Sequence, residues 1–241
     1  MPVALITGAA RGIGRAIARR LAADGVRVVV NYRENAGAAQ ELVAEVIREG
    51  GSATAVPGDV ADPDQLLRLF DATEDAFGGL DILVVNAGIA RFAPIADAST
   101  EDFDQQFAVN TRATFLALRE AARRLRDGGR VVVISSGATV TGRPGAGVYA
   151  ASKAATDQLV RAAAGELGAR GITVNSVRPG AIRTDSLLGT VDTAALDAIA
   201  DRTPLRRIGE PTDIAGIVAF LASADAGWIT GQHLHAGGGL F

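Results

Sequence analysis

The stretch that decides the fold is VALITGAARGIG, residues 3–14. Residues 3–7 are mostly apolar and few in number, which predicts a short buried strand. The glycines that follow predict a tight turn, and the turn opens a helix that continues to about Ala23. A strand, a glycine turn and a helix in this order form the first part of a strand–helix–strand crossover. The stretch therefore predicts an α/β fold.

The rest of the chain repeats this alternation. Further strands are predicted at 26–31, 53–57, 82–86, 130–135, 172–177 and 232–235, and helices at 36–49, 64–77, 100–126, 148–169 and 212–222. Continuous apolar strands that alternate with helices indicate a parallel sheet covered on both faces. We expect one Rossmann-like, doubly wound domain over residues 1–241, with about seven strands and a ligand crevice at their carboxyl ends.

The segment 184–204 has the least regular pattern and lies beyond the last long helix. A segment of mixed character near the crevice is typical of a mobile substrate loop. We therefore expect a flexible loop at about 184–204.

Composition narrows the class of protein. The chain has 48% hydrophobic residues, 21% charged residues and a net charge of −3, which argues against a nucleic-acid partner or a membrane surface. It has no cysteine, so disulfides and thiolate metal ligands are excluded. The two histidines, His233 and His235, lack nearby thiols or clustered carboxylates, and we expect no metal site. No apolar run approaches the ~20 residues that span a bilayer, and we see no basic leader before the first strand. A cytoplasmic protein is expected.

The glycine turn is a candidate phosphate site. Gly8, Gly12 and Gly14 permit a tight turn and close backbone approach, while the helix N-terminus supplies amide donors and partial positive charge. Their spacing is Gly-x-x-x-Gly-x-Gly, which differs from the usual Gly-x-Gly-x-x-Gly of dinucleotide sites. A plain structural turn is the alternative, but the position between the first strand and first helix favours phosphate binding.

Tyr149 and Lys153 are the candidate acid–base pair. Four residues apart on a predicted helix, they lie on one face. A nearby ammonium favours the phenolate and can lower the tyrosine pKa, ordinarily ~10, by ~1–3. Lys153 is the only lysine among 24 basic residues, which indicates a need for a compact ammonium that arginine does not meet. The alternative is an exposed tyrosine beside a solvated lysine.

These motifs resemble the short-chain dehydrogenase/reductase family along essentially the whole chain. In order they are Thr7-Gly8…Gly12-Ile13-Gly14, Asp59-Val60, Asn86-Ala87-Gly88, Asn110, Ser136, Tyr149-Ala150-Ala151-Ser152-Lys153 and Pro179-Gly180. The resemblance implies a nicotinamide-dependent oxidoreductase that interconverts a ketone and a secondary alcohol. Its catalytic residues would be Asn110, Ser136, Tyr149 and Lys153.

The resemblance also implies a role for each position. Ser136, rather than its neighbour Ser135, would hydrogen-bond the substrate carbonyl, and Asn110 would hold a water that links Lys153 to solvent. Lys153 would also hold the nicotinamide ribose. Asp59 and Val60 would contact adenine, and Asn86-Ala87-Gly88 would lie beside the cofactor. Pro179, Gly180, Ile182 and Thr184 would meet the nicotinamide, with Gly8, Arg11, Gly12, Ile13 and Gly14 at the phosphates.

The end of the second strand distinguishes NADP from NAD. An acidic residue there would bind the ribose 2′-hydroxyl and repel a 2′-phosphate. This chain has Asn31, Tyr32 and Arg33 instead, with Arg11 nearby in the glycine turn. Guanidiniums bind phosphate through paired donors, so we expect NADP(H). Solvated surface arginines and an NAD-dependent sugar or alcohol dehydrogenase are the alternatives.

The segments 206–211 and 229–232 are similar to those of 3-oxoacyl-carrier-protein reductases. Carrier-protein docking in that group relies on basic residues at two places, of which Arg170 is retained while Asp127 replaces the other. A small-molecule ketone is therefore the substrate we expect. The substrate-wall candidates are Ala90, Arg91, Ala138, Arg143, Leu187 and Leu188. Arg91 and Arg143 would either receive a carboxylate or be solvated loop residues.

Three further expectations follow from the same resemblance. The family usually forms homotetramers through the helices around Asn110 and Tyr149 and the last strand, so a homotetramer is expected.

A non-catalytic NADP-binding regulatory protein is the rival from another class, but Ser136, Tyr149 and Lys153 are all intact. An enoyl reductase of this superfamily typically places tyrosine and lysine further apart, which argues against that activity.

Overall fold

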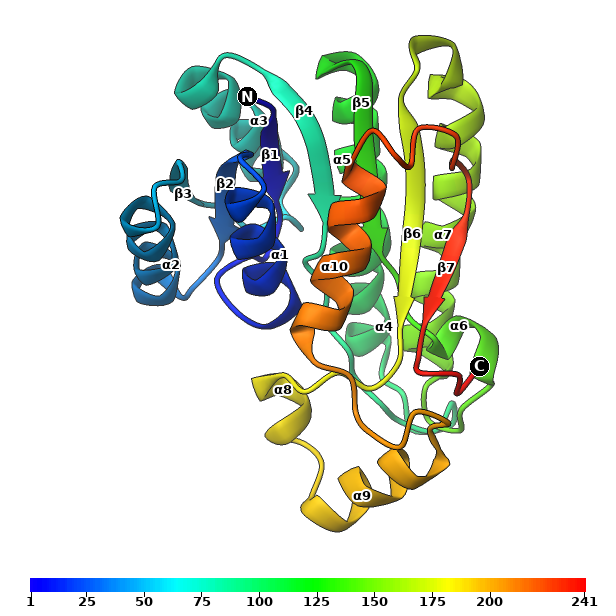
Figure 1. Ribbon diagram of the computed structural model, residues 1–241. Helices are drawn as coiled ribbons and strands as arrows, with labels where there is room; N and C mark the ends of the chain where they lie inside the picture. The colour runs from blue at the N-terminus through cyan, green and yellow to red at the C-terminus, as the bar shows by residue number, and fades with distance from the viewer.

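The computed structural model describes residues 1–241 and contains one sheet of seven parallel strands in the order β3-β2-β1-β4-β5-β6-β7 (Figure 1). The strands are β1 (Val3–Ile6), β2 (Arg27–Tyr32), β3 (Ala53–Pro57), β4 (Leu80–Val85), β5 (Leu125–Ile134), β6 (Thr173–Pro179) and β7 (His233–Ala236). The order reverses direction after β1, which is the topological switch point of a doubly wound sheet. The predicted fold class is confirmed.

Helices cover both faces of the sheet (Figure 1). They are α1 (Gly12–Ala23), α2 (Ala36–Arg48), α3 (Pro63–Phe77), α4 (Thr100–Gln106), the π-helix η1 (Phe107–Arg112), α5 (Ala113–Arg124), α6 (Ala138–Thr141), α7 (Gly147–Leu167), the 3₁₀ turn η2 (Gly168–Arg170), α8 (Asp185–Leu188), α9 (Thr193–Arg202) and α10 (Pro211–Ala222). Helices α1, α2 and α10 pack on one face, and α3, α5 and α7 on the other. No helix is both long enough and apolar enough to cross a bilayer.

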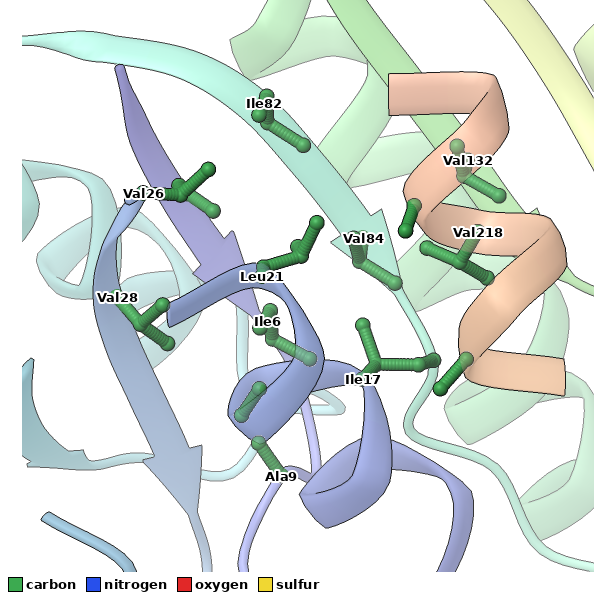
Figure 2. Close-up of a cluster of buried hydrophobic side chains, with 14 of the residues drawn as sticks. Ile6, Ala9, Ile17, Leu21, Val26, Val28, Ile82, Val84, Val132 and Val218 are labelled. Carbon is green, nitrogen blue, oxygen red and sulfur yellow. The ribbon is translucent and has the colours of Figure 1, made fainter. Parts of the chain in front are cut away.

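Each strand except β7 contributes side chains to two hydrophobic clusters, because successive side chains point to opposite faces of the sheet. In β1, Ile6 belongs to the cluster under α1 and α10, whereas Leu5 belongs to the cluster under α3, α5 and α7. Figure 2 shows the first cluster, where Ile17 of α1 lies between β1 and Val218 of α10. Burial on both faces explains why the central strands β1 and β4 are largely apolar. Because all the strands are parallel, their carboxyl ends lie along one edge of the sheet.

Three local features differ from the sequence prediction. The helix expected over 100–126 is interrupted by the π-helix η1, and β5 begins at Leu125, where it pairs with Leu80 before the register shifts. The segment expected to be irregular at 184–204 contains α8 and α9, which lie beyond the carboxyl ends of the strands (Figure 1). Side-chain caps from Thr184 and Asp192 start these two helices.

Candidate active site

Ser136, Tyr149 and Lys153 come together at the carboxyl end of β5. Tyr149 and Lys153 lie on the first two turns of α7, and Ser136 follows β5 directly. The Ser136 hydroxyl lies near the Tyr149 hydroxyl, close enough to lower the pKa of Tyr149. Lys153 is only 5% exposed, and its Nζ donates to the carbonyl oxygen of Ile134 at 2.9 Å. The burial of Lys153 excludes the alternative in which its ammonium is solvated.

The pKa of Tyr149 differs from the sequence expectation. Burial of the hydroxyl raises the pKa of Tyr149 above its ordinary value, and the nearby Ser136 hydroxyl opposes this only in part. The expectation that the pKa of Tyr149 is lowered was wrong. It rested on the charge of the nearby ammonium alone, whereas desolvation disfavours the phenolate and raises the pKa. Tyr149 is therefore protonated at neutral pH and suited to give a proton to a carbonyl oxygen.

Burial acts on Lys153 in the opposite sense. It lowers the pKa of Lys153 to about 8, while the negative charge of Asp157, one helical turn further along α7, opposes the shift. The ammonium form thus dominates below pH 8. Lys153 is the single lysine of the chain, so no other lysine can supply this charge.

The structure separates the two neighbouring serines. The Ser136 Oγ accepts a hydrogen bond from the amide of Ala138 and also reaches Tyr149. Ser135 is 3% exposed, and its Oγ has no hydrogen-bond partner. Only Ser136 lies beside Tyr149, as its spacing predicts.

Asn110 lies in the π-helix, where the extra residue per turn aims its side chain at the loop after β4. Its Oδ1 accepts from the amide of Ile89 at 2.9 Å, and its Nδ2 donates to the Ile89 carbonyl and to the Ser152 Oγ. π-Helical turns are frequent at functional sites. The proposed role in holding a water stays a prediction, but Asn110 clearly fixes the loop that passes over Lys153.

The glycine turn is held open by side chains from the neighbouring strands. Gly8 and Gly12 have φ angles of 62° and 55°, which favour glycine. The Asn86 Nδ2 donates to the carbonyls of Thr7 and Gly8 at 3.0 Å each. A Cβ at Gly14 would lie 2.5 Å from the Gly8 carbonyl oxygen. The turn therefore exposes the N-terminus of α1 to a ligand phosphate.

Of the other two residues of the Asn86-Ala87-Gly88 loop, Ala87 packs against the glycine turn and Gly88 packs against Lys153. A Cβ at Gly8 would lie 3.0 Å from the Ala87 Cα, and a Cβ at Gly88 would lie 3.0 Å from the Lys153 Nζ. The loop thus connects the phosphate turn to the lysine. Such close backbone packing explains why small residues occupy these positions.

The residues at the end of β2 divide into two groups. Asn31 is 1% exposed, with its Oδ1 accepting from the Gly8 amide and its Nδ2 donating to the Gly58 carbonyl, so it supports the turn. Arg33 is half-exposed and forms ion pairs with two carboxylates. Its Nη2 lies 2.6 Å from the Glu34 Oε1, and its Nη1 lies 3.7 Å from the Asp59 Oδ2. Direct contact of Asn31 or Tyr32 with a cofactor stays a prediction.

Arg11 precedes α1 on the surface and forms no ion pair. It lines a cleft with Gly12, Arg183 and Thr184. A free guanidinium next to a phosphate turn adds positive charge where a cofactor phosphate would bind.

The remaining predicted cofactor residues follow β3 and β6 in the chain. Val60 is 7% exposed within the second hydrophobic cluster, and the Asp59 carboxylate accepts from the Ala61 amide, as a turn residue does. Across the crevice, the Gly180 amide donates to the Ala236 carbonyl. The Thr184 methyl lies 3.3 Å from the position of a Cβ on Gly12. The phosphate turn and the segment after β6 are thereby neighbours.

Sequence reasoning missed two side chains of the site. Phe92 contacts the Tyr149 ring edge-on, with centroids 5.6 Å apart. Ser152 is fully buried and connects Asn110 to the Tyr149 carbonyl oxygen, to which its hydroxyl donates at 2.7 Å. An aromatic residue in the loop after a central strand was the available signal for Phe92. Nothing in the pattern separated Ser152 from an ordinary helix residue.

Comparison with known proteins gives consistent relatives along the whole chain. A family model described as enoyl-(acyl carrier protein) reductase matches residues 8–241. Versicolorin reductase of Emericella nidulans is 44% identical over 99% of this chain and 95% of its own length. Trihydroxynaphthalene reductase of Colletotrichum orbiculare is 39% identical over 96% of this chain and 86% of its own. A short-chain dehydrogenase from Burkholderia cenocepacia, solved in complex with NADP, is 42% identical with a TM-score of 0.94 over 99% of this chain and 97% of its own.

Proposed function

Because the chain belongs to the short-chain dehydrogenase/reductase family, we infer that it is an NADP(H)-dependent oxidoreductase that interconverts a ketone and a secondary alcohol. The observation that carries this function is the proximity of the Ser136 and Tyr149 hydroxyls beside the buried Lys153. The glycine turn with its exposed helix N-terminus fits the phosphates of a dinucleotide. The relative from Burkholderia cenocepacia was solved with NADP.

The protein residues supply position and a proton. The bound nicotinamide supplies or accepts the hydride. In this proposal the Ser136 hydroxyl donates to the substrate carbonyl oxygen and polarises it. Tyr149, kept protonated by burial, gives its proton to that oxygen as negative charge develops. The Lys153 ammonium stabilises the phenolate that remains.

The description of the matching family model names enoyl reduction, and the site supports ketone reduction instead. Tyr149 and Lys153 are adjacent on successive turns of α7, and Ser136 provides a hydroxyl for a carbonyl oxygen. The relatives from Emericella and Colletotrichum are named reductases. The tyrosine–lysine spacing typical of enoyl reductases is absent.

A small-molecule substrate is favoured over one tethered to a carrier protein. Arg170, the retained basic residue, donates to the Asp127 carboxylate at 2.7 Å and to the Ala122 carbonyl. Its charge is therefore paired with the acid that replaces the second basic residue. Little net positive charge is left there to attract an acidic carrier protein.

The function is tested by NADPH oxidation across a panel of ketones, with the alcohol product identified by mass spectrometry. The panel should include aryl ketones, because one relative is named for a trihydroxynaphthalene, and 3-oxoacyl thioesters. Reduction of at least one ketone is expected. If NADPH binds and no carbonyl compound is reduced, the regulatory alternative replaces this function.

Ketone reduction should become slower as the pH rises above neutrality. The pKa of Lys153 is lowered to about 8 and that of Tyr149 is raised, so below pH 8 both groups carry the proton that reduction requires. As pH rises through about 8, Lys153 loses its charge first. We expect kcat/KM for NADPH, which reports on the free enzyme, to decline with a midpoint near pH 8. A flat profile up to pH 9.5 would contradict this assignment.

We also propose that the protein is a homotetramer that acts in the cytoplasm. Phe107, Phe115 and Leu159 line a groove across η1, α5 and α7, and Trp228, close to β7 in the chain, is 99% exposed. Large apolar surfaces of this kind mark interfaces between proteins. A mass of four chains by light scattering supports the assembly, and a monomer refutes it. Activity in the soluble fraction of lysed cells is expected.

A further inference from the structure

Two loops form the mouth of the site on the Tyr149 side. One follows β4 and contains Phe92, and the other precedes α7 and contains Arg143. The Ala93 amide donates to the Gly145 carbonyl at 2.9 Å, which ties the loops together. Phe92 is half-exposed and contacts Tyr149 edge-on. A side chain that lies over the Phe92 ring is therefore at most one aromatic ring away from Tyr149.

Arg143 occupies that position. Its guanidinium carbon lies 4.9 Å from the centre of the Phe92 ring, a cation–π contact that orders the side chain. Arg143 is exposed and forms no ion pair. The Arg143 side chain donates no hydrogen bond within the protein, so its N–H groups remain free to donate to a ligand.

Arg91, the other arginine at the mouth, already has side-chain partners within the protein. Its Nε lies 3.3 Å from the Asp102 carboxylate, and its Nη2 donates to the Gln105 side chain at 2.7 Å. The sequence left Arg91 and Arg143 equivalent as receivers of a carboxylate. The structure distinguishes them, because Arg91 already has a carboxylate partner and Arg143 has none.

We propose that Arg143 is a specificity-determining residue that receives an anionic oxygen group, such as a carboxylate, on the ketone substrate. This inference rests on the proposed ketone reduction. A carboxylate accepts two parallel N–H bonds from a guanidinium, and a ring in the substrate can contact Phe92 at the same time. The substrate class is thus a ketone with a negatively charged group beyond the carbonyl, at the side of Tyr149.

The test compares 4-acetylbenzoate with its methyl ester, which differ in charge and share the ketone. The wild type should reduce the acid more efficiently. Arg143→Ala should lower kcat/KM for the acid about tenfold, mainly through KM, as for a solvent-accessible charge-assisted hydrogen bond. It should leave kcat/KM for the ester within about twofold. Arg91→Ala is the matched control and should keep the wild-type preference for the acid.

The outcomes separate this inference from the proposed function. If the two compounds are not reduced, their inhibition constants against the best ketone of the panel give the same comparison. Equal effects of Arg143→Ala on acid and ester, or an equal effect of Arg91→Ala, would overturn the role of Arg143 while ketone reduction stands. If no ketone of the panel is reduced by the wild type, the proposed function fails, and this inference fails with it.

Discussion

Replacing Lys153 by arginine is expected to lower kcat for ketone reduction at least about 100-fold, within the range of ~10²–10⁴ for positioned proton transfer. The substitution keeps a positive charge, but the site has no room for a guanidinium. Lys153 is 5% exposed, its Nζ donates to the Ile134 carbonyl, and a Cβ on Gly88 would already lie 3.0 Å from that nitrogen. The larger, planar fork would displace the loop that contains Gly88.

Steady-state kinetics with a reducible ketone measures this effect, and circular dichroism shows whether the variant is folded. Arg126→Lys is a suitable control, because Arg126 is a half-exposed partner of Asp81 at the amino ends of β4 and β5, at the opposite edge of the sheet from the catalytic residues. It should retain wild-type activity. If Lys153→Arg works within about threefold of the wild type, a compact ammonium is not required and the mechanism is wrong.

Replacing Gly14 by alanine is expected to raise the Kd for NADPH about 100-fold or more, a loss of about 2.7 kcal/mol of binding free energy. The new Cβ would lie 2.5 Å from the Gly8 carbonyl oxygen and 2.9 Å from the Ala9 Cα. These are backbone atoms, so rotation of a side chain cannot relieve the collision. The turn must open, and the amides at the start of α1 then no longer converge on a phosphate.

Fluorescence titration with NADPH measures the Kd, and chemical unfolding measures the accompanying loss of stability, which we expect to be about 1–3 kcal/mol. Gly37→Ala is the matched control. Gly37 lies in α2, and nothing is within 4 Å of its Cβ position. The control should stabilise the protein by about 0.4–1 kcal/mol and bind NADPH normally. Normal NADPH binding by Gly14→Ala would show that the turn does not hold the phosphates.

The fold was predictable because the periodic signals are strong and agree with one another. Strands such as Val28–Val30 are apolar on both faces, which only a sheet covered on both sides accommodates. Helix geometry predicted that Tyr149 and Lys153 share one face of a helix, and both lie on α7. Ser136 required the family resemblance, and the structure explains the choice over Ser135 by placing only Ser136 at Tyr149.

What the sequence did not reveal depends on contacts between distant residues. The sign of the pKa shift at Tyr149 is set by burial, which no local pattern reports. The pairing of Arg170 with Asp127 joins residues 43 positions apart. The π-helix at Asn110 is one extra residue in a helical turn, and its pattern resembles that of an ordinary helix. The different surroundings of Arg91 and Arg143 likewise arise from tertiary structure.

The central claim is that Tyr149 gives the proton in NADPH-dependent ketone reduction, and Tyr149→Phe tests it most directly. The substitution removes one oxygen and leaves the ring that contacts Phe92. Single-turnover reduction of the best ketone, measured beside NADPH titration on the same sample, separates chemistry from binding. We predict a rate of hydride transfer lowered about 10²–10⁴-fold, with the Kd for NADPH within about twofold of the wild type. A variant that binds NADPH normally and reduces the ketone at the wild-type rate would contradict the claim.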